Sequence, residues 1–347
     1  MNNPIEKEDL IDIANSINKQ FYNSSIFVTG ATGLVGSTLI KGLLMCNELN
    51  NSNIKIIALI RSEKKAKMIF GNSDIEYVVE DITKKLECVL NIDYIIHGAS
   101  ATASKFFITK PVDTIKTSID GTMNILELAK EKAVKKVVYL SSMEMYGIPY
   151  EGKEYCDESI LGYINPLQVR SCYSEGKRMC ENICASYASQ YGVNVVIARL
   201  SQTFGSSVNW NENRIFASIA KSVINKEDVI LHSKGESVGN YCYTSDVINA
   251  LFILLEKGNN AEAYNISNEA TNISIKNMAS MVCKEFSNGN SKVVIDLPKG
   301  DQIFGYAPDV KLKLNNHKMM ELGWRPKYDL REMYERLINS LKYQMEK

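Results

Sequence analysis

Tyr173 and Lys177 are the two side chains of this sequence whose types and spacing point most directly to chemistry. Four residues apart, they share one face of a helix predicted over residues 171–192. A nearby ammonium favours the ionised phenol and lowers a tyrosine pKa that is about 10 in water. The pair could therefore remove an alcohol proton near neutral pH, as hydride transfer from a carbinol carbon requires. Ser142, which ends an apolar run over residues 134–142, could hold the reacting hydroxyl or carbonyl by a hydrogen bond.

Gly30, Gly33 and Gly36 stand at the junction of a strand predicted over residues 26–30 and a helix predicted over residues 32–46. A helix N-terminus has unpaired amide groups and partial positive charge, so a diphosphate can bind there without a charged side chain. Glycines let the backbone turn sharply and approach the phosphates closely. The sequence predicts a dinucleotide site at this turn, formed by Gly30, Thr32, Gly33, Leu34, Val35 and Gly36.

The end of the second predicted strand, over residues 54–60, bears on which dinucleotide binds. Dinucleotide-binding strands often supply an acidic residue to the ribose hydroxyl, whereas this chain has Arg61. A guanidinium can pair with a 2′-phosphate, so NADP is favoured over NAD. The alternative is that Arg61 is a solvated surface charge. Asp81, which ends a strand predicted over residues 75–81, is expected to meet the adenine through its side chain or through the amide of Ile82.

Short apolar strands alternate with amphipathic helices up to about residue 203. Further strands are predicted over residues 93–99 and 193–200, and a long helix begins at Pro111. Strands that are apolar on both faces indicate a parallel sheet covered on both sides, which predicts an α/β fold with a Rossmann-type doubly wound sheet. The later segments are shorter and more polar and predict a smaller C-terminal α/β substrate-binding lobe. The predicted parts are an accessory N-terminal helix (1–22), the dinucleotide-binding domain (23–203 plus about 240–260) and the lobe (204–239 and 261–347).

The composition limits the classes of function. The 347 residues include 40 Lys+Arg and 40 Asp+Glu, so the zero net charge provides no whole-protein field for nucleic acid or a membrane surface. The eight cysteines lack metal-ligand spacing, so no metal site is expected, and free thiols favour a cytoplasmic location. The charged N-terminal segment differs from a signal peptide, and no apolar stretch is long enough to span a bilayer.

Seven stretches of the sequence together resemble the extended branch of the short-chain dehydrogenase/reductase superfamily. This branch includes nucleotide-sugar epimerases, dehydratases, decarboxylases and ketoreductases. The stretches are TGATGLVGS, YIIHGAS, IDGTMNILELA, YLSSMEMYG, YSEGK, ARLSQTFG and LGWRP, and the likeness covers about residues 24–335. The resemblance implies a nicotinamide cofactor and a nucleotide-sugar substrate, and leaves the reaction open.

By position, Ser142, Tyr173 and Lys177 match the catalytic triad of that family. Tyr173 and Lys177 are then also cofactor contacts, with Lys177 expected at the nicotinamide ribose. The family's cofactor-binding stretch after the fourth strand corresponds to Gly98, Ala99 and Ser100.

Glu144 matches a glutamate that decarboxylases and 4,6-dehydratases of this branch place beside the sugar. A carboxylate there can move a proton at the carbon next to a transient ketone, which makes Glu144 a catalytic candidate. The alternative is a solvated or helix-capping glutamate. Dehydratases carry an aspartate at the preceding position, which is Met143 here, and this counts against a 4,6-dehydratase.

Three further positions depart from the family pattern. Ser118 replaces an asparagine that often completes a proton relay, and Gln202 replaces an asparagine that touches the substrate phosphates. Gly239 replaces an arginine that clamps the diphosphate, so Arg214 or Lys234 is a substitute clamp unless it is a surface charge. The expected substrate contacts are Ser142, Met143, Glu144, Gln202 and Arg214.

These expectations lead to three hypotheses. The first is an epimerase/dehydratase-type enzyme that forms a 4-keto sugar and then epimerises at C4 or decarboxylates. The second is an NADPH-dependent 4-ketoreductase, which Arg61 supports. The third is a non-catalytic NADP-binding regulator, against which the intact triad argues. A homodimer that pairs helices over about residues 111–132 and 172–190 is also expected.

Overall fold

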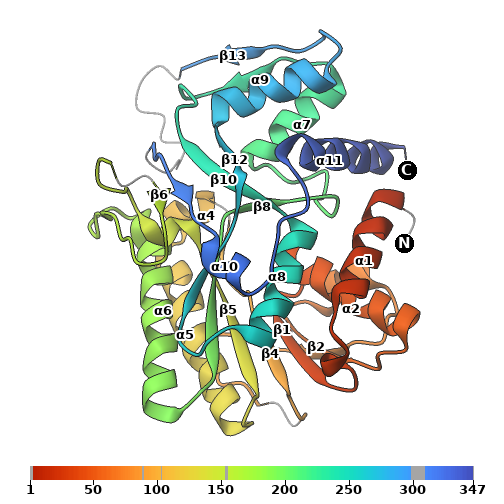
Figure 1. Ribbon diagram of the computed structural model, residues 1–347, viewed down its shortest axis with the longest axis vertical. Coiled ribbons are helices and arrows are strands. Elements are labelled where there is room, and N and C mark those ends of the chain that lie inside the picture. Colours follow the sequence, from red (N-terminus) through yellow and green to blue (C-terminus); the bar gives the residue numbers. More distant parts are fainter. Residues whose placement is uncertain (1–2, 88–89, 103, 153–154, 298–308, 347) are drawn as a thin grey trace.

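A parallel sheet of seven strands forms the centre of the molecule, in the order β11-β7-β5-β4-β1-β2-β3 (Figure 1). The computed structural model describes residues 3–87, 90–102, 104–152, 155–297 and 309–346. The strands are Ser25–Thr29 (β1), Lys55–Ile60 (β2), Glu76–Val79 (β3), Tyr94–His97 (β4), Lys136–Ser142 (β5), Val195–Leu200 (β7) and Ala263–Ile266 (β11). The strand order reverses between β1 and β4, and in such sheets ligands bind at the carboxyl ends of the strands. The predicted fold class and every strand predicted before residue 203 are confirmed.

The strand β11 was not predicted as part of this sheet. It pairs in parallel with β7, with Ala263 opposite Ile197 and Ile266 opposite Leu200, although it lies in the range assigned to the C-terminal lobe. Four residues are too few to give a clear periodic pattern. The other boundaries between the domain and the lobe stay a prediction.

The two faces of the sheet are buried by different helices. Alternate strand residues point to opposite faces, so Ile26 and Val28 pack with one group of helices while Phe27 packs with the other. The first face is covered by α1, α2 and α8, and the second by α5 and α6. These helices are Pro4–Ser16 (α1), Leu34–Asn50 (α2), Thr244–Lys257 (α8), Pro111–Glu131 (α5) and Ser171–Tyr191 (α6).

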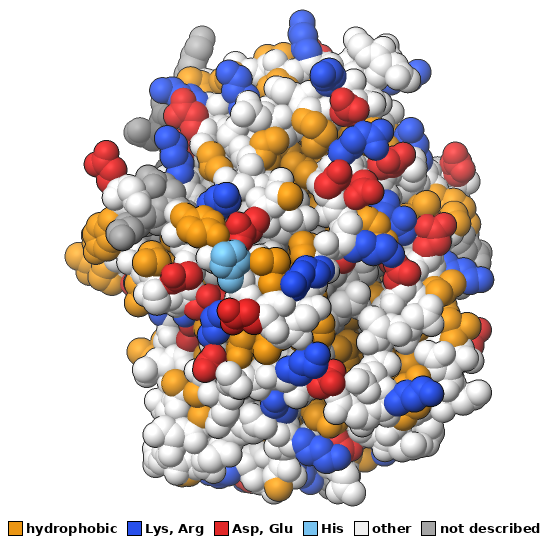
Figure 2. Space-filling model, viewed as in Figure 1, with side chains coloured by type: hydrophobic (Ala, Val, Ile, Leu, Met, Phe, Trp, Pro, Cys, Tyr) orange, Lys and Arg blue, Asp and Glu red, His pale blue; other side chains and the backbone are white. Residues whose placement is uncertain are grey.

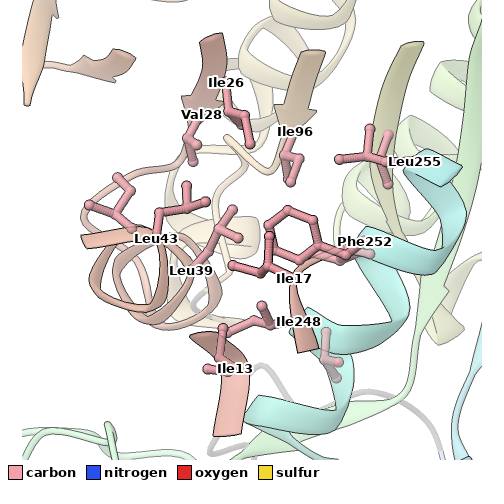
Figure 3. Close-up of a cluster of buried hydrophobic side chains, with 14 of the residues drawn as sticks. Ile13, Ile17, Ile26, Val28, Leu39, Leu43, Ile96, Ile248, Phe252 and Leu255 are labelled. Atoms are coloured by element: carbon pink, nitrogen blue, oxygen red, sulfur yellow. The ribbon is translucent and has the colours of Figure 1, made fainter. Parts of the chain in front are cut away.

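The N-terminal helix α1 is part of the core. Its first turn begins at Pro4, and the side chain of Asn3 caps it by accepting from the amides of Ile5 and Glu6. Ile13 and Ile17 project between α2 and α8, toward the β1 and β4 side chains (Figure 3). Both isoleucines are almost fully buried, so α1 seals this face of the sheet.

A second core, built mostly from residues after position 203, lies above the carboxyl ends of the main strands (Figure 1). It is centred on the stacked rings of Phe204 and Phe216, whose centroids are 4.7 Å apart. Its elements are Gln202–Phe204 (β8), Val229–Leu231 (β9), Val238–Tyr243 (β10), Asn268–Ser274 (β12), Val293–Ile295 (β13), Ile215–Asn225 (α7), Ile275–Phe286 (α9) and Leu330–Met345 (α11). β10 pairs in parallel with β8 and antiparallel with β12, and β9 pairs with β13.

Short elements complete the described chain. They are Lys19–Phe21 (η1), Glu63–Phe70 (α3), Ser104–Thr109 (α4), Met143–Tyr146 (η2), Tyr155–Cys156 (β6), Lys313–Leu314 (β14) and His317–Glu321 (α10). η2 packs with β6 and β14 around the buried side chains of Met145 and Leu314.

A buried carboxylate fastens α1 to the second core. Asp9 is 2% exposed and accepts hydrogen bonds from Ser206, from Tyr243 at 2.6 Å and from Arg336 of α11 at 2.7 Å. Burial raises the Asp9 pKa, while these hydrogen bonds and the Arg336 charge oppose the shift. α1 therefore contacts both the main sheet's helices and the C-terminal helix.

The surface carries charges of both signs close together. Figure 2 shows lysines and arginines interspersed with aspartates and glutamates over one face, as the zero net charge leads one to expect. Within the described ranges, no helix has the length and apolar character needed to cross a membrane.

Candidate active site

The candidate site lies where β5 ends and α6 begins. Ser142 is the last residue of β5, and its hydroxyl caps η2 by accepting from the Glu144 amide at 3.2 Å. Tyr173 and Lys177 lie in the first two turns of α6, which packs against β5 and η2. The fold thus brings together the three residues of the expected triad, and the Ser142 hydroxyl is close enough to the Tyr173 phenol to lower its pKa.

Tyr173 is 8% exposed, and its surroundings oppose ionisation. Burial raises the pKa of Tyr173 above its usual value, and the negative charge of Glu144 raises it further. The Ser142 hydrogen bond and the positive charges of Arg170 and Arg214 act in the opposite direction. The expected lowering of the Tyr173 pKa by an ammonium is therefore wrong, because desolvation outweighs the favourable charges.

Lys177, the third member of the triad, is held in place by the backbone of β5. Its Nζ donates to the Leu140 carbonyl at 2.6 Å and lies 5.8 Å from the centre of the Tyr173 ring. Burial lowers the Lys177 pKa to about 8. Burial and the Lys177 charge together lower the pKa of His97 to about 3, so the imidazole is neutral and bonds to Thr29 at 2.7 Å.

Two side chains at this site were missed by sequence reasoning. Arg170 forms a forked ion pair with the Glu144 carboxylate, with nitrogen–oxygen distances of 2.8 and 3.1 Å. Phe107 of α4 stacks on Tyr173, with ring centroids 4.4 Å apart and planes 13° apart. The signal for Arg170 was its position one helical turn before Tyr173. Phe107 lies in an apolar segment that gave no such signal.

The glycine turn fits a dinucleotide. Gly30 has a φ of +69°, and a Cβ there would lie 2.6 Å from the Gly98 carbonyl oxygen. A Cβ on Gly36 would lie 2.3 Å from the carbonyl oxygen of Gly30. Gly33 precedes α2 without a side-chain cap, so the first amides of this helix are available to a phosphate.

The other expected phosphate and nicotinamide contacts surround this turn. Thr32 is half-buried there, while Leu34 and Val35 pack partly against the two cores. Thr29 accepts from the amides of Gly98 at 3.1 Å and Ala99 at 3.0 Å, which fixes the stretch that ends in Ser100. These contacts place the β4 end directly beside the glycine turn.

The expected adenine-end residues lie at the carboxyl ends of β2 and β3. Arg61 is exposed, and its charge helps to lower the pKa of Asp81 after the two larger contributions from Thr83. The Asp81 carboxylate accepts from the amide and hydroxyl of Thr83, both at 2.9 Å. The Ile82 side chain is buried and lies against Gly121, and its carbonyl accepts from the Asn124 side-chain amide at 2.8 Å.

Met143 and Gly239 are neighbours, although they are far apart in the sequence. A Cβ on Gly239 would lie 3.3 Å from the Met143 Cε. Position 239, where the family clamp arginine would stand, therefore borders the residue between Ser142 and Glu144. The two departures are linked, because a larger side chain at 239 would require Met143 to move.

The remaining substrate candidates are more peripheral. Gln202 is exposed at the start of β8, and Lys234 is exposed between β9 and β10. Arg214 precedes α7, pairs with Glu212 at 2.9 Å, and is close enough to influence Tyr173. Ser118 on α5 has a buried hydroxyl without a hydrogen-bond partner among the described residues, and it faces Gly176 beside Lys177.

Curated relatives of this chain are nucleotide-sugar decarboxylases by name. UDP-glucuronic acid decarboxylase 3 of Arabidopsis thaliana is 32% identical over 311 residues, which are 89% of this chain and 86% of that protein. UDP-glucuronic acid decarboxylase 1 of Xenopus tropicalis is 28% identical and covers 92% of this chain and 73% of its own length.

Solved structures share the fold at lower identity. UDP-glucose 4-epimerase of Thermotoga maritima, solved with UDP-glucose, has a TM-score of 0.78 at 22% identity and covers 93% of this chain and 100% of its own. dTDP-glucose 4,6-dehydratase of Bacillus anthracis, solved with NAD, has a TM-score of 0.75 at 21% identity, with coverages of 93% and 98%. The model of the NAD dependent epimerase/dehydratase family matches residues 26–267. This match, together with the 32% identity to a plant relative, shows that the chain belongs to the NAD dependent epimerase/dehydratase family.

Proposed function

We propose that this enzyme, which is of the extended short-chain dehydrogenase/reductase type, oxidises a nucleotide-bound sugar at C4 and then epimerises or decarboxylates the 4-keto sugar. The observation that carries the proposal is the juxtaposition of the Ser142–Tyr173–Lys177 group with the Glu144 carboxylate, at the carboxyl end of β5. The names of the relatives support a nucleotide-sugar substrate.

Each side chain has a distinct part in this reaction. Ser142 orients the C4 oxygen by a hydrogen bond, and Tyr173 takes the C4 hydroxyl proton. Lys177 contributes positive charge that stabilises the phenolate. The nicotinamide cofactor, when bound, accepts and returns the hydride. Epimerisation at C4 needs only the return of the hydride to the opposite face of the ketone. In decarboxylation the C4 ketone takes up the electron pair left by the departing carbon dioxide, and we assign Glu144 to the proton transfer at that neighbouring carbon. Because Gly239 occupies the clamp position, we assign the substrate diphosphate to Arg214, whose charge reaches Tyr173.

A panel of sugar nucleotides tests this proposal. An epimerase or decarboxylase converts its substrate without net consumption of cofactor, whereas the 4-ketoreductase alternative consumes NADPH stoichiometrically. Uronic acid and neutral sugar nucleotides should be compared with product analysis, because release of carbon dioxide identifies decarboxylation. A non-catalytic regulator would bind cofactor, convert no member of the panel, and bind equally well after Tyr173→Phe.

We propose NADP as the cofactor, because exposed Arg61 directly follows β2, where the adenosine ribose is expected. Arg61→Ala should weaken NADP binding about tenfold or more, since a charge-assisted contact to the 2′-phosphate is lost. NAD binding should stay within about twofold. Fluorescence titration with the reduced cofactors measures both affinities, and Lys67→Ala on α3, which removes an exposed partner of Glu63, is the control. Tighter binding of NAD than NADP by the unmodified protein would reject this assignment.

A cytoplasmic homodimer completes the proposal. α5 and α6 pack side by side on one face of the sheet, and they expose the apolar side chains of Val112, Ile115, Met123 and Met179. Such residues favour helix pairing between two copies. Light scattering at micromolar concentration should give about twice the chain mass of 38.9 kDa, and Met123→Lys should shift the mass toward the monomer. A monomeric mass for the unmodified protein would contradict the dimer.

A further inference from the structure

Arg170 makes the closest charged contact of the Glu144 carboxylate. Two guanidinium nitrogens meet the two carboxylate oxygens, Nη1 to Oε2 at 2.8 Å and Nη2 to Oε1 at 3.1 Å. This forked geometry fixes the plane and the position of the carboxylate, which a single lysine contact would not. The Glu144 side chain is 27% exposed and that of Arg170 is 14% exposed, so the pair is only partly screened by solvent.

Arg170 is itself held against the tyrosine. It directly precedes α6, three residues before Tyr173, and its guanidinium lies 5.1 Å from the centre of the Phe107 ring. The same Phe107 ring stacks on Tyr173. Arg170, Phe107 and Tyr173 thus form a packed series, and Glu144 is joined to that series through the ion pair.

Four charged side chains surround Tyr173. Glu144 on η2 supplies a negative charge, which disfavours the phenolate. Arg170 before α6 and Arg214 before α7 supply positive charges, which favour it. Lys177, one turn along α6, lies 5.8 Å from the ring. At Tyr173, the positive charge of Arg170 therefore offsets the negative charge of Glu144, which is the carboxylate that Arg170 pairs with.

We propose that Arg170 is a positioning residue of the reaction: it fixes the Glu144 carboxylate beside the reacting sugar and balances the charge of Glu144 next to Tyr173. This inference rests on the proposed function, in which Tyr173 is the base and Glu144 works on the keto sugar. It explains how a carboxylate that assists the second step can lie beside a phenol that must ionise in the first.

The test is the pH dependence of the first step, measured as the single-turnover formation of reduced nicotinamide from sugar nucleotide. The rate should rise with pH as Tyr173 loses its proton. Arg170→Gln should move this rise to higher pH by about one unit, because a favourable charge is removed and that of Glu144 is left unbalanced. Arg170→Lys keeps the charge, so the rise should stay in place. Its turnover should nevertheless fall about tenfold, because lysine lacks the fork.

Two further variants decide the question if Arg170→Gln does not fold. Glu144→Gln should move the rise to lower pH by about one unit, and the double variant Arg170→Gln/Glu144→Gln should return it close to the wild-type position. Identical profiles for Glu144→Gln and the double variant would overturn the inference, as would an unshifted profile for a folded Arg170→Gln. Arg331→Gln is the matched control, because Arg331 also pairs with glutamates and lies over a phenylalanine ring, but on α11.

The two proposals fail in different ways. If no sugar nucleotide reduces the cofactor in the wild-type protein, the proposed function is wrong. If the wild-type reaction proceeds but its pH dependence ignores Arg170, only the positioning role is wrong.

Discussion

Replacing Tyr173 with phenylalanine is expected to lower kcat by about 100- to 10,000-fold, the usual contribution of a general acid or base. The phenyl ring keeps its stacking on Phe107 and its burial, so the loss is confined to the hydroxyl. Cofactor affinity should change less than about threefold, since the glycine turn and Lys177 are untouched. Steady-state turnover of the best substrate, together with cofactor titration, measures both effects.

Tyr187→Phe provides the matched control for this prediction. Tyr187 is also buried on α6, but it lies near the end of the helix away from Tyr173. Its hydroxyl donates to Glu127 at 2.8 Å. Its replacement removes one hydrogen bond and should leave kcat within about twofold. A Tyr173→Phe protein that retained a tenth or more of wild-type turnover would contradict the assignment of Tyr173 as the base.

The second large effect concerns stability. Asp9→Ala should reduce the free energy of unfolding by about 3 kcal/mol, because it leaves the guanidinium of Arg336 and the hydroxyls of Ser206 and Tyr243 without their shared acceptor. The Arg336 side chain is 18% exposed and also pairs with Glu8, so solvent and that ion pair limit the loss of unfolding free energy. Urea denaturation followed by circular dichroism measures the change.

Asp12→Ala isolates the effect of burial on the same helix. Asp12 pairs with Lys327, but both side chains are well exposed, and exposed ion pairs contribute roughly 0–1 kcal/mol. The Asp12→Ala protein should therefore unfold close to the wild-type urea midpoint. Equal midpoints for the two variants would show that Asp9 does not anchor α1.

Patterns of residues along the chain predicted the main sheet and the expected triad. Apart from the partly exposed strand β3, the strands before residue 203 are mostly buried on both faces and alternate with helices, so their pattern is strong. Ser142, Tyr173 and Lys177 each stand at the end of a strand or the start of a helix, where the fold itself determines their direction. Such positions follow from the order of the elements.

Contacts between distant segments could not be predicted in this way. Three such contacts depend on the conformation of the segments that connect the main strands and helices. They are the Glu144–Arg170 pair, the Phe107–Tyr173 stack and the Met143–Gly239 contact. The direction of the Tyr173 pKa shift was also missed, because spacing reveals the neighbouring ammonium but not the depth of burial. Short β11 gave too few residues for a periodic pattern.

The position of α1 also limits how the enzyme can move. Asp9 and Arg336 join the first helix to α11, and Ile13 and Ile17 join it to α2 and α8, on one side of the molecule (Figure 1). If the second core swings relative to the sheet, this fastened side must act as the hinge. α6, which carries Tyr173, lies across the molecule from α1 (Figure 1). A small rotation about α1 would therefore displace the second core most on the side of the reacting groups.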